Sequence, residues 1–176
     1  MKKSVGLVLL LIATFAYSSV GSPGNKKGTP PIKYKSPGVS TSECKSSVAM
    51  IIFENQDLKN ALSACKSDPK GRAALTALRA QATCRDYEFK EDNGGKCNEV
   101  AAPYMKCVAG KLGYLKAGGS IDGAKILDRY RNYAVSLGSR CRDLYDSALG
   151  KCGTTISNYA FLGKLKCLTT AINQSG

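Results

Sequence analysis

The chain has 176 residues and carries 26 lysines and arginines against 13 acidic residues, a net charge of +13, with eight cysteines and no histidine. Without histidine, the Ser-His-Asp and Cys-His nucleophile systems and the HExxH zinc hydrolases are excluded. The positive charge favours anionic partners such as lipid headgroups, sulfated glycans, cell walls or acidic proteins, and it also keeps a protein soluble. The charge alone does not separate these two roles.

Residues 1–21 have the three parts of a secretory signal peptide. Lys2 and Lys3 precede an apolar run from Val5 to Ala16, which is too short to span a bilayer, and small residues follow it. Cleavage after Ser18 or after residue 21 fits the pattern, and we place the mature start near residue 22. No later stretch has the length of a membrane helix. We therefore expect a secreted, extracellular protein with no transmembrane segment.

Residues 22–41 predict a flexible arm, because they hold four of the six prolines and no acid. The segment is also basic, and we expect its lysines to contact an anionic surface if the arm is a tether. A plain linker is the alternative. The four lysines of the arm are Lys26, Lys27, Lys33 and Lys35.

Residues 42–176 predict one all-α domain, a compact disulfide-stapled bundle of about six helices. Apolar residues recur at helical spacing in successive segments, and no alternating β pattern extends over more than a few residues. Expected helix starts are Ser42, Asp57, Asp122 and Ser139. The third helix is expected to run from residue 71 to 92 and the last from residue 157 to 172, and Pro103 is expected to kink or restart the fourth.

The eight cysteines predict four disulfides, because an even number of cysteines in an oxidising compartment is typical of a disulfide framework. The spacing leaves the connectivity open. A structural zinc site is the alternative, but there is no Cys-x-x-Cys pair and no histidine ligand. We expect neither a metal nor a cofactor. The cysteines are Cys44, Cys65, Cys84, Cys97, Cys107, Cys141, Cys152 and Cys167.

Two other patterns in the sequence bear on its chemistry. The segment 128–133 interleaves arginines with tyrosines, as some nucleic-acid binders do, but an extracellular location makes nucleic acid an unsuitable partner. Acidic residues gather at 88–92 and at 54–57, and a pair of carboxylates is the one general acid–base system left to the chain. Both groups stand at expected helix ends beside lysines, where solvated acids are common. We expect no enzyme activity and no catalytic residue.

The segment from Lys106 to Leu115, KCVAGKLGYL, and the segment from Gly119 to Ile126, GSIDGAKI, resemble the insect odorant- and pheromone-binding proteins. In that comparison Cys107 corresponds to the third cysteine of the family. Cys141, Cys152 and Cys167 then correspond to the fourth, fifth and sixth. The resemblance implies a six-helix bundle locked by disulfides around an apolar cavity, without enzyme activity. The chain departs from the family pattern at Pro103, where the second cysteine would stand.

The disulfide connectivity tests this resemblance. An interlocked pattern that joins Cys141 to Cys167 across Cys152 would favour it, and purely local pairs would count against it.

Three functions remain open. The first is a carrier of small apolar ligands, and a solid core is the alternative reading of the same residues. The second is a cationic effector, such as a venom, salivary or host-defence protein, that acts on an anionic surface, glycan or receptor. The third is an extracellular-matrix or biomineral-associated protein. For the carrier, the expected ligand-lining residues are Val108, Leu112, Leu115, Ile126, Leu127, Tyr130 and Leu162.

Overall fold

The computed structural model describes residues 39–53, 55–89 and 95–175. They belong to the second of two compact units, Lys35–Gly176, and the first unit is Met1–Tyr34. The predicted signal peptide and the four lysines of the predicted arm lie outside the described residues. Everything below concerns the second unit by itself.

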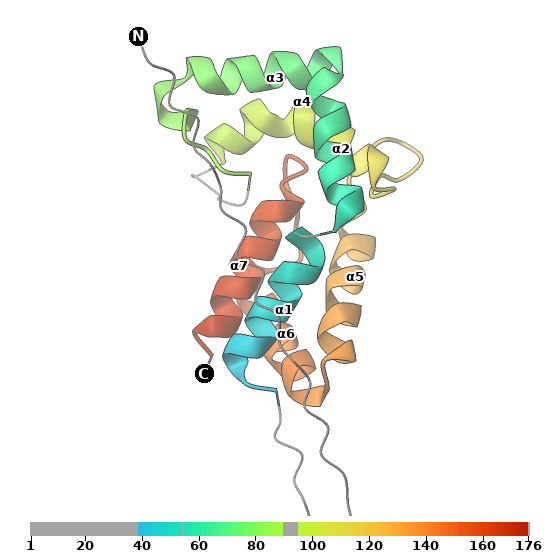
Figure 1. The fold of residues 1–176 in the computed structure, drawn as a ribbon, viewed down its shortest axis with the longest axis vertical. Coiled ribbons are helices and arrows are strands. Elements are labelled where there is room, and N and C mark those ends of the chain that lie inside the picture. The colour runs from blue at the N-terminus through green and yellow to red at the C-terminus, as the bar shows by residue number, and fades with distance from the viewer. Residues whose placement is uncertain (1–38, 54, 90–94, 176) are drawn as a thin grey trace, which may run out of the picture. The chain divides into compact units, whose positions relative to one another are not determined.

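Within the described ranges the secondary structure is helical, with seven α-helices, one short 3₁₀ helix and a single isolated bridge between Leu115 and Ile121 (Figure 1). This confirms the all-α prediction. The elements are α1 (Thr41–Phe53), α2 (Gln56–Ser67), α3 (Pro69–Ala80), η1 (Ala82–Cys84), α4 (Lys96–Lys111), α5 (Gly123–Ser136), α6 (Ser139–Cys152) and α7 (Phe161–Asn173).

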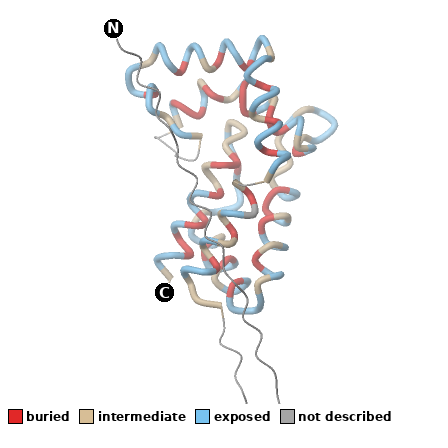
Figure 2. The backbone as a smooth tube through the Cα atoms, viewed as in Figure 1, coloured by how far each residue is buried: buried red, intermediate tan, exposed pale blue. Residues whose placement is uncertain are grey.

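The helices pack in two groups that share one core. In the first group α7 packs against α1 and α6, and α5 packs against α6 and α1. In the second group α3 lies along α4, and α2 packs against both (Figure 1). Buried positions recur along every α-helix in Figure 2 and form one apolar cluster. The largest fully buried side chains are Tyr104, Tyr130, Tyr145, Phe161 and Met105.

Polar side chains set several helix starts, but not always those the sequence predicts. At α1 the cap is Ser40 and not Ser42: the Ser40 Oγ accepts from the Glu43 N–H at 3.2 Å, and the Ser40 N–H donates to the Glu43 carboxylate at 2.7 Å. This reciprocal pair satisfies two backbone donors. Asp122 does cap α5, where its carboxylate accepts from the Lys125 N–H at 3.1 Å.

At two other helix starts the cap stands before the predicted residue. Asn55, not Asp57, caps α2, because its side chain accepts from the Asp57 N–H at 2.8 Å. At α6 the cap position is Gly138, and Ser139 is the first helical residue. Helix α3 follows α2 directly, with Asp68 as its cap and Pro69 in its first turn. Proline suits this position because the N–H that it lacks would have no partner there.

The third helix is much shorter than predicted. It ends at Ala80, where Gln81 has extended backbone angles, and the chain continues through η1 into a non-helical stretch up to residue 89. Tertiary contacts with α4 explain why the helix ends early. Phe89 packs against Tyr104 of α4 with ring centroids 5.0 Å apart, and Cys84 is bonded to Cys97 of α4. These contacts hold residues 84–89 against α4. If α3 continued as a helix, Cys84 and Phe89 could not make both contacts.

Helix α4 continues through Pro103 as one element, so of the two predicted effects of this proline the restart does not occur. One further helix prediction is corrected at its end. Helix α7 begins at Phe161 and not at residue 157, because Asn158 and Tyr159 have φ values of 51° and 58° and form a turn. The Tyr159 hydroxyl donates to the Gly119 carbonyl at 3.1 Å, which ties this turn to the loop between α4 and α5.

All eight cysteines are paired, and the pairs do not cross. Cys84–Cys97 lies inside Cys65–Cys107, which lies inside Cys44–Cys141, and Cys152–Cys167 follows them. The sequence predicts the four bonds but not this nesting. The pattern has no bond between Cys141 and Cys167, and the Cys44–Cys141 pair spans 97 positions, so it is neither interlocked nor purely local.

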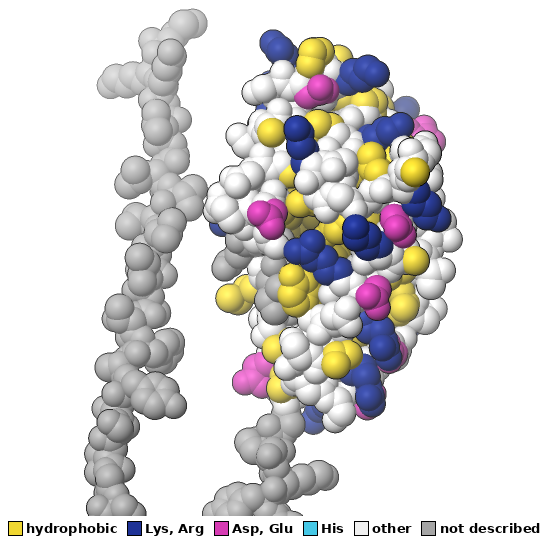
Figure 3. All heavy atoms as spheres, turned by 90° about the vertical axis from the view of Figure 1, so that its right-hand side faces the viewer, with side chains coloured by type: hydrophobic (Ala, Val, Ile, Leu, Met, Phe, Trp, Pro, Cys, Tyr) yellow, Lys and Arg dark blue, Asp and Glu magenta, His cyan; other side chains and the backbone are white. Residues whose placement is uncertain are grey.

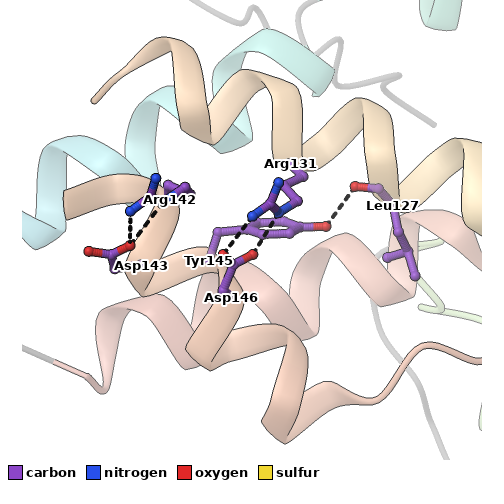
Figure 4. A network of polar contacts seen from close by, with 6 residues as sticks. All are labelled: Leu127, Arg131, Arg142, Asp143, Tyr145 and Asp146. Carbon is purple, nitrogen blue, oxygen red and sulfur yellow. Dashed lines mark hydrogen bonds and ion pairs between the residues drawn. The ribbon is translucent and has the colours of Figure 1, made fainter. Parts of the chain in front are cut away.

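A buried tyrosine links α5 to α6 (Figure 4). The Tyr145 hydroxyl of α6 donates to the Leu127 carbonyl of α5 at 2.8 Å. Beside it, Arg131 makes a two-point ion pair with Asp146, at 2.8 and 2.9 Å. Both partners of the pair are largely exposed, so the buried phenol contributes more to stability than the ion pair does.

The nested arrangement predicts unequal contributions of the disulfides to stability. Replacing Cys44 and Cys141 by alanine is expected to lower the free energy of unfolding by about 4 kcal/mol, and replacing Cys152 and Cys167 by about 3 kcal/mol. Cys44–Cys141 closes a longer loop than Cys152–Cys167 does, even though Cys65–Cys107 shortens the effective length of that loop. The entropy lost on closing a loop grows with its length. Urea unfolding of the two double variants measures the difference. A larger loss from the Cys152–Cys167 pair would contradict the prediction.

Candidate functional site

The seven expected ligand-lining residues do not meet around one cavity. Four of them, Val108, Ile126, Leu127 and Tyr130, are buried between helices, and Leu112 and Leu115 are half-buried. Leu162 is also buried but borders a groove on another side of α2. The side chains therefore belong mainly to the core, and Leu112, Tyr130 and Leu162 border hollows.

A pocket beneath Arg129 is the place where two of the expected residues, Leu112 and Tyr130, come together. Its free volume is only ≈ 10 Å³, which is room for about one water molecule. Phe161 fills one side, and the Tyr130 hydroxyl donates to the Phe161 carbonyl at 3.3 Å. The interior at this point is packed, so it holds no ligand in this conformation.

Arg129 and Tyr114 both line this pocket. Its guanidinium lies 5.7 Å from the ring centroid of Tyr114, and hydrogen bonding to Tyr133 is the main reason that its pKa is raised. A shallow, more polar depression beside it is bordered by Asp57, Lys111 and Arg129. Figure 3 shows one face of the molecule, on which hydrophobic side chains lie exposed among lysines and arginines. An aromatic ring under a guanidinium stabilises this position of Arg129 by cation–π attraction.

A larger hollow lies on the other side of Leu58, and we name it the apolar groove. Its volume is ≈ 410 Å³ and its lining is mainly apolar, and among the described residues Glu88 is the acidic one that borders it. Leu58 borders both this groove and the pocket beneath Arg129. The apolar lining residues come from α1, α2, the segment after η1 and α7, and they are Phe53, Leu58, Leu62, Tyr87, Phe89 and Leu162.

Contacts with α4 fix the walls of the apolar groove. The Tyr87 and Phe89 rings meet edge to face with centroids 5.4 Å apart, and Phe89 packs on Tyr104. The Tyr87 hydroxyl donates to the Asn98 side chain. On the opposite wall the Tyr104 hydroxyl donates to the Leu62 carbonyl at 2.8 Å. One helix therefore positions both walls.

A second hollow adjoins the first, and we name it the cationic groove. Its volume is ≈ 380 Å³, and α3, η1 and the following segment form it. Leu75, Leu78, Tyr87 and Phe89 supply an apolar floor. No acidic residue among those described lines this groove, and its basic residues are Lys66, Arg72, Arg79 and Arg85.

Sequence reasoning missed both grooves because it placed Tyr87 and Phe89 inside a helix. The available signal was the alternation of Tyr87, Glu88 and Phe89, which is the two-residue period of an extended chain. Of the acidic clusters, Asp57 and Glu88 border separate hollows. Glu54, Glu91 and Asp92 lie outside the described residues. Across the described ranges no three Cys, Asp or Glu residues are placed to hold a metal ion.

The fold and these hollows define a class, an all-α domain with four disulfides and two adjoining surface grooves. No family model, curated protein or solved structure matches the chain. None of the helices in the described ranges is long and apolar enough to span a membrane. We therefore infer the function from the grooves themselves.

Buried phenols predict an unusual alkaline titration. Burial is the main cause of a raised pKa at Tyr104, Tyr114, Tyr130 and Tyr145. Because the folded values lie above the unfolded value of about 10, these groups contribute stability that is complete below about pH 10 and is lost as the pH rises through the folded values.

Near-ultraviolet phenolate absorbance measures this directly, without interference from tryptophan, which the chain lacks. At about pH 11 the native protein should show clearly less phenolate than the denatured chain, followed by alkaline unfolding. Titration curves that coincide for the native and denatured protein would show that these tyrosines are accessible to solvent.

Proposed function

We propose that this chain is a secreted, non-enzymatic carrier that binds a small apolar ligand in the apolar groove. The observation that carries the proposal is the hollow of ≈ 410 Å³ with six apolar lining residues. Ligand sites in proteins usually measure about 300–1,000 Å³ and are mainly apolar. The expected site in the interior is replaced by one on the surface, because the pocket beneath Arg129 has only ≈ 10 Å³ of free volume.

The disulfides support both parts of this proposal. Four disulfides are typical of proteins from oxidising compartments, which agrees with the predicted signal peptide. Cys65–Cys107 and Cys84–Cys97 also hold the two sides of the groove to α4, so the groove exists before the ligand arrives. A site that is already formed loses less conformational entropy on binding.

Buried area sets the expected affinity. A ligand that loses about 300 Å² of apolar surface to water gains roughly 7 kcal/mol at about 25 cal/mol per Å². Association entropy opposes this gain, so we expect dissociation constants above about 10 μM.

The fluorescent probe N-phenyl-1-naphthylamine tests the proposal, because this neutral dye brightens in apolar surroundings. We expect saturable binding of one dye per chain at micromolar protein. Leu62→Gln should weaken this binding about tenfold, since the amide replaces an apolar contact of the groove.

Leu149→Gln is the matched control, because Leu149 is also half-buried but lies on α6 and does not border the groove. Circular dichroism confirms that both variants are folded. Equal weakening by the two substitutions, or an absence of saturable binding to the wild-type protein, would refute the carrier function in this groove.

A further inference from the structure

The apolar groove and the cationic groove meet along one wall. Tyr87 and Phe89 border both hollows, so a ligand that occupies both grooves would cross these rings. The first hollow offers apolar side chains, and the second offers four basic residues around an apolar floor. A neutral apolar ligand would use only the first of these surfaces.

Helix α2 runs along both grooves. Leu58 and Leu62 border the apolar groove and Lys66 borders the cationic groove, at intervals of four residues. Residues four apart lie on the same side of a helix, and eight residues extend about 12 Å along its axis. The helix therefore presents an apolar track that ends in a positive charge, with a length that matches a medium alkyl chain.

The basic residues of the cationic groove are not neutralised by acidic partners within the described part of the chain. The ion pairs recorded there are Arg131–Asp146 and Arg142–Asp143, both on the α5–α6 side. Arg72 makes a long contact of 3.4 Å with the Ser67 carbonyl, which leaves its charge uncompensated. Three of the four groove cations are arginines, whose planar guanidinium groups bind carboxylates and phosphates through two parallel hydrogen bonds.

We infer that the ligand is an anionic amphiphile, with its alkyl chain in the apolar groove and its carboxylate or phosphate among Lys66, Arg72, Arg79 and Arg85. This inference rests on the proposed carrier function and names the ligand class. The apolar groove supplies the affinity for the alkyl chain of the ligand, and the cationic groove selects its headgroup. Charge selection of this kind weakens in high salt, because the groove is open to solvent.

Displacement of N-phenyl-1-naphthylamine by four ligands of equal chain length tests the selection: dodecanoate, dodecyl phosphate, dodecanol and dodecyltrimethylammonium, all below their micelle concentrations. The wild-type protein should bind the two anions about tenfold more tightly than dodecanol, and the cation most weakly. High salt should reduce the difference. Tighter binding of the phosphate than of the carboxylate would identify the preferred headgroup.

The triple variant Arg72→Gln/Arg79→Gln/Arg85→Gln should lose the preference for anions while its affinity for dodecanol and for the dye stays unchanged. The control Lys116→Gln/Arg140→Gln/Lys166→Gln removes the same charge from exposed positions that border neither groove, and it should keep the preference. Equal losses in both variants would overturn the inference, because the effect would then come from net charge.

The outcomes separate this inference from the carrier function. A wild-type protein that binds the dye and dodecanol but does not prefer anions overturns the headgroup selection and leaves the carrier function standing. A wild-type protein that binds no dye overturns the carrier function and, with it, this inference.

Discussion

The attachment of α4 to two other parts of the chain is the constraint on which the rest of the structure depends. Cys107 bonds to Cys65 at the end of α2, and Cys97 bonds to Cys84 in η1. Together with the burial of Tyr104, these bonds fix α2 on one side of α4 and the segment after η1 on another. Both grooves lie between the elements that α4 holds in place. A loss of either bond would therefore alter the shape of the grooves as well as the stability of the fold.

The interior and the surface of this domain serve different purposes. Tyrosines and a phenylalanine fill the interior. The tyrosine hydroxyls donate to carbonyls of neighbouring helices, as Tyr145 does to Leu127. No buried side-chain polar atom among the described residues lacks a partner. A core packed in this way resists the opening that an interior ligand would need. Grooves between rigid elements avoid this cost, and the proposed function places the ligand there.

The helical class, the number of disulfides and most core positions follow from sequence, because helical periodicity and cysteine count are local or countable signals. Asp122 as a cap is such a local signal. The fate of residues 81–89 is not, since strong helix formers precede them and only long-range contacts with Cys97 and Tyr104 draw them out of the helix. The same holds for the cysteine partners, which depend on which helices become neighbours. The grooves were missed for this reason, because they exist only where that segment leaves the helix.

The nesting of the disulfides bears on the order in which the chain can oxidise during its synthesis. Cys84 and Cys97 emerge close together, and Cys65 finds Cys107 soon afterwards, each without threading through a closed loop. Cys44 has to wait for Cys141, 97 positions later, which takes about 5–20 s at ribosomal rates of about 5–20 residues per second. During that time the Cys44 thiol is free to pair wrongly with one of the four cysteines that lie between it and Cys141 in the sequence. A wrong bond at Cys44 has to be undone by thiol–disulfide exchange before the native bond to Cys141 can form.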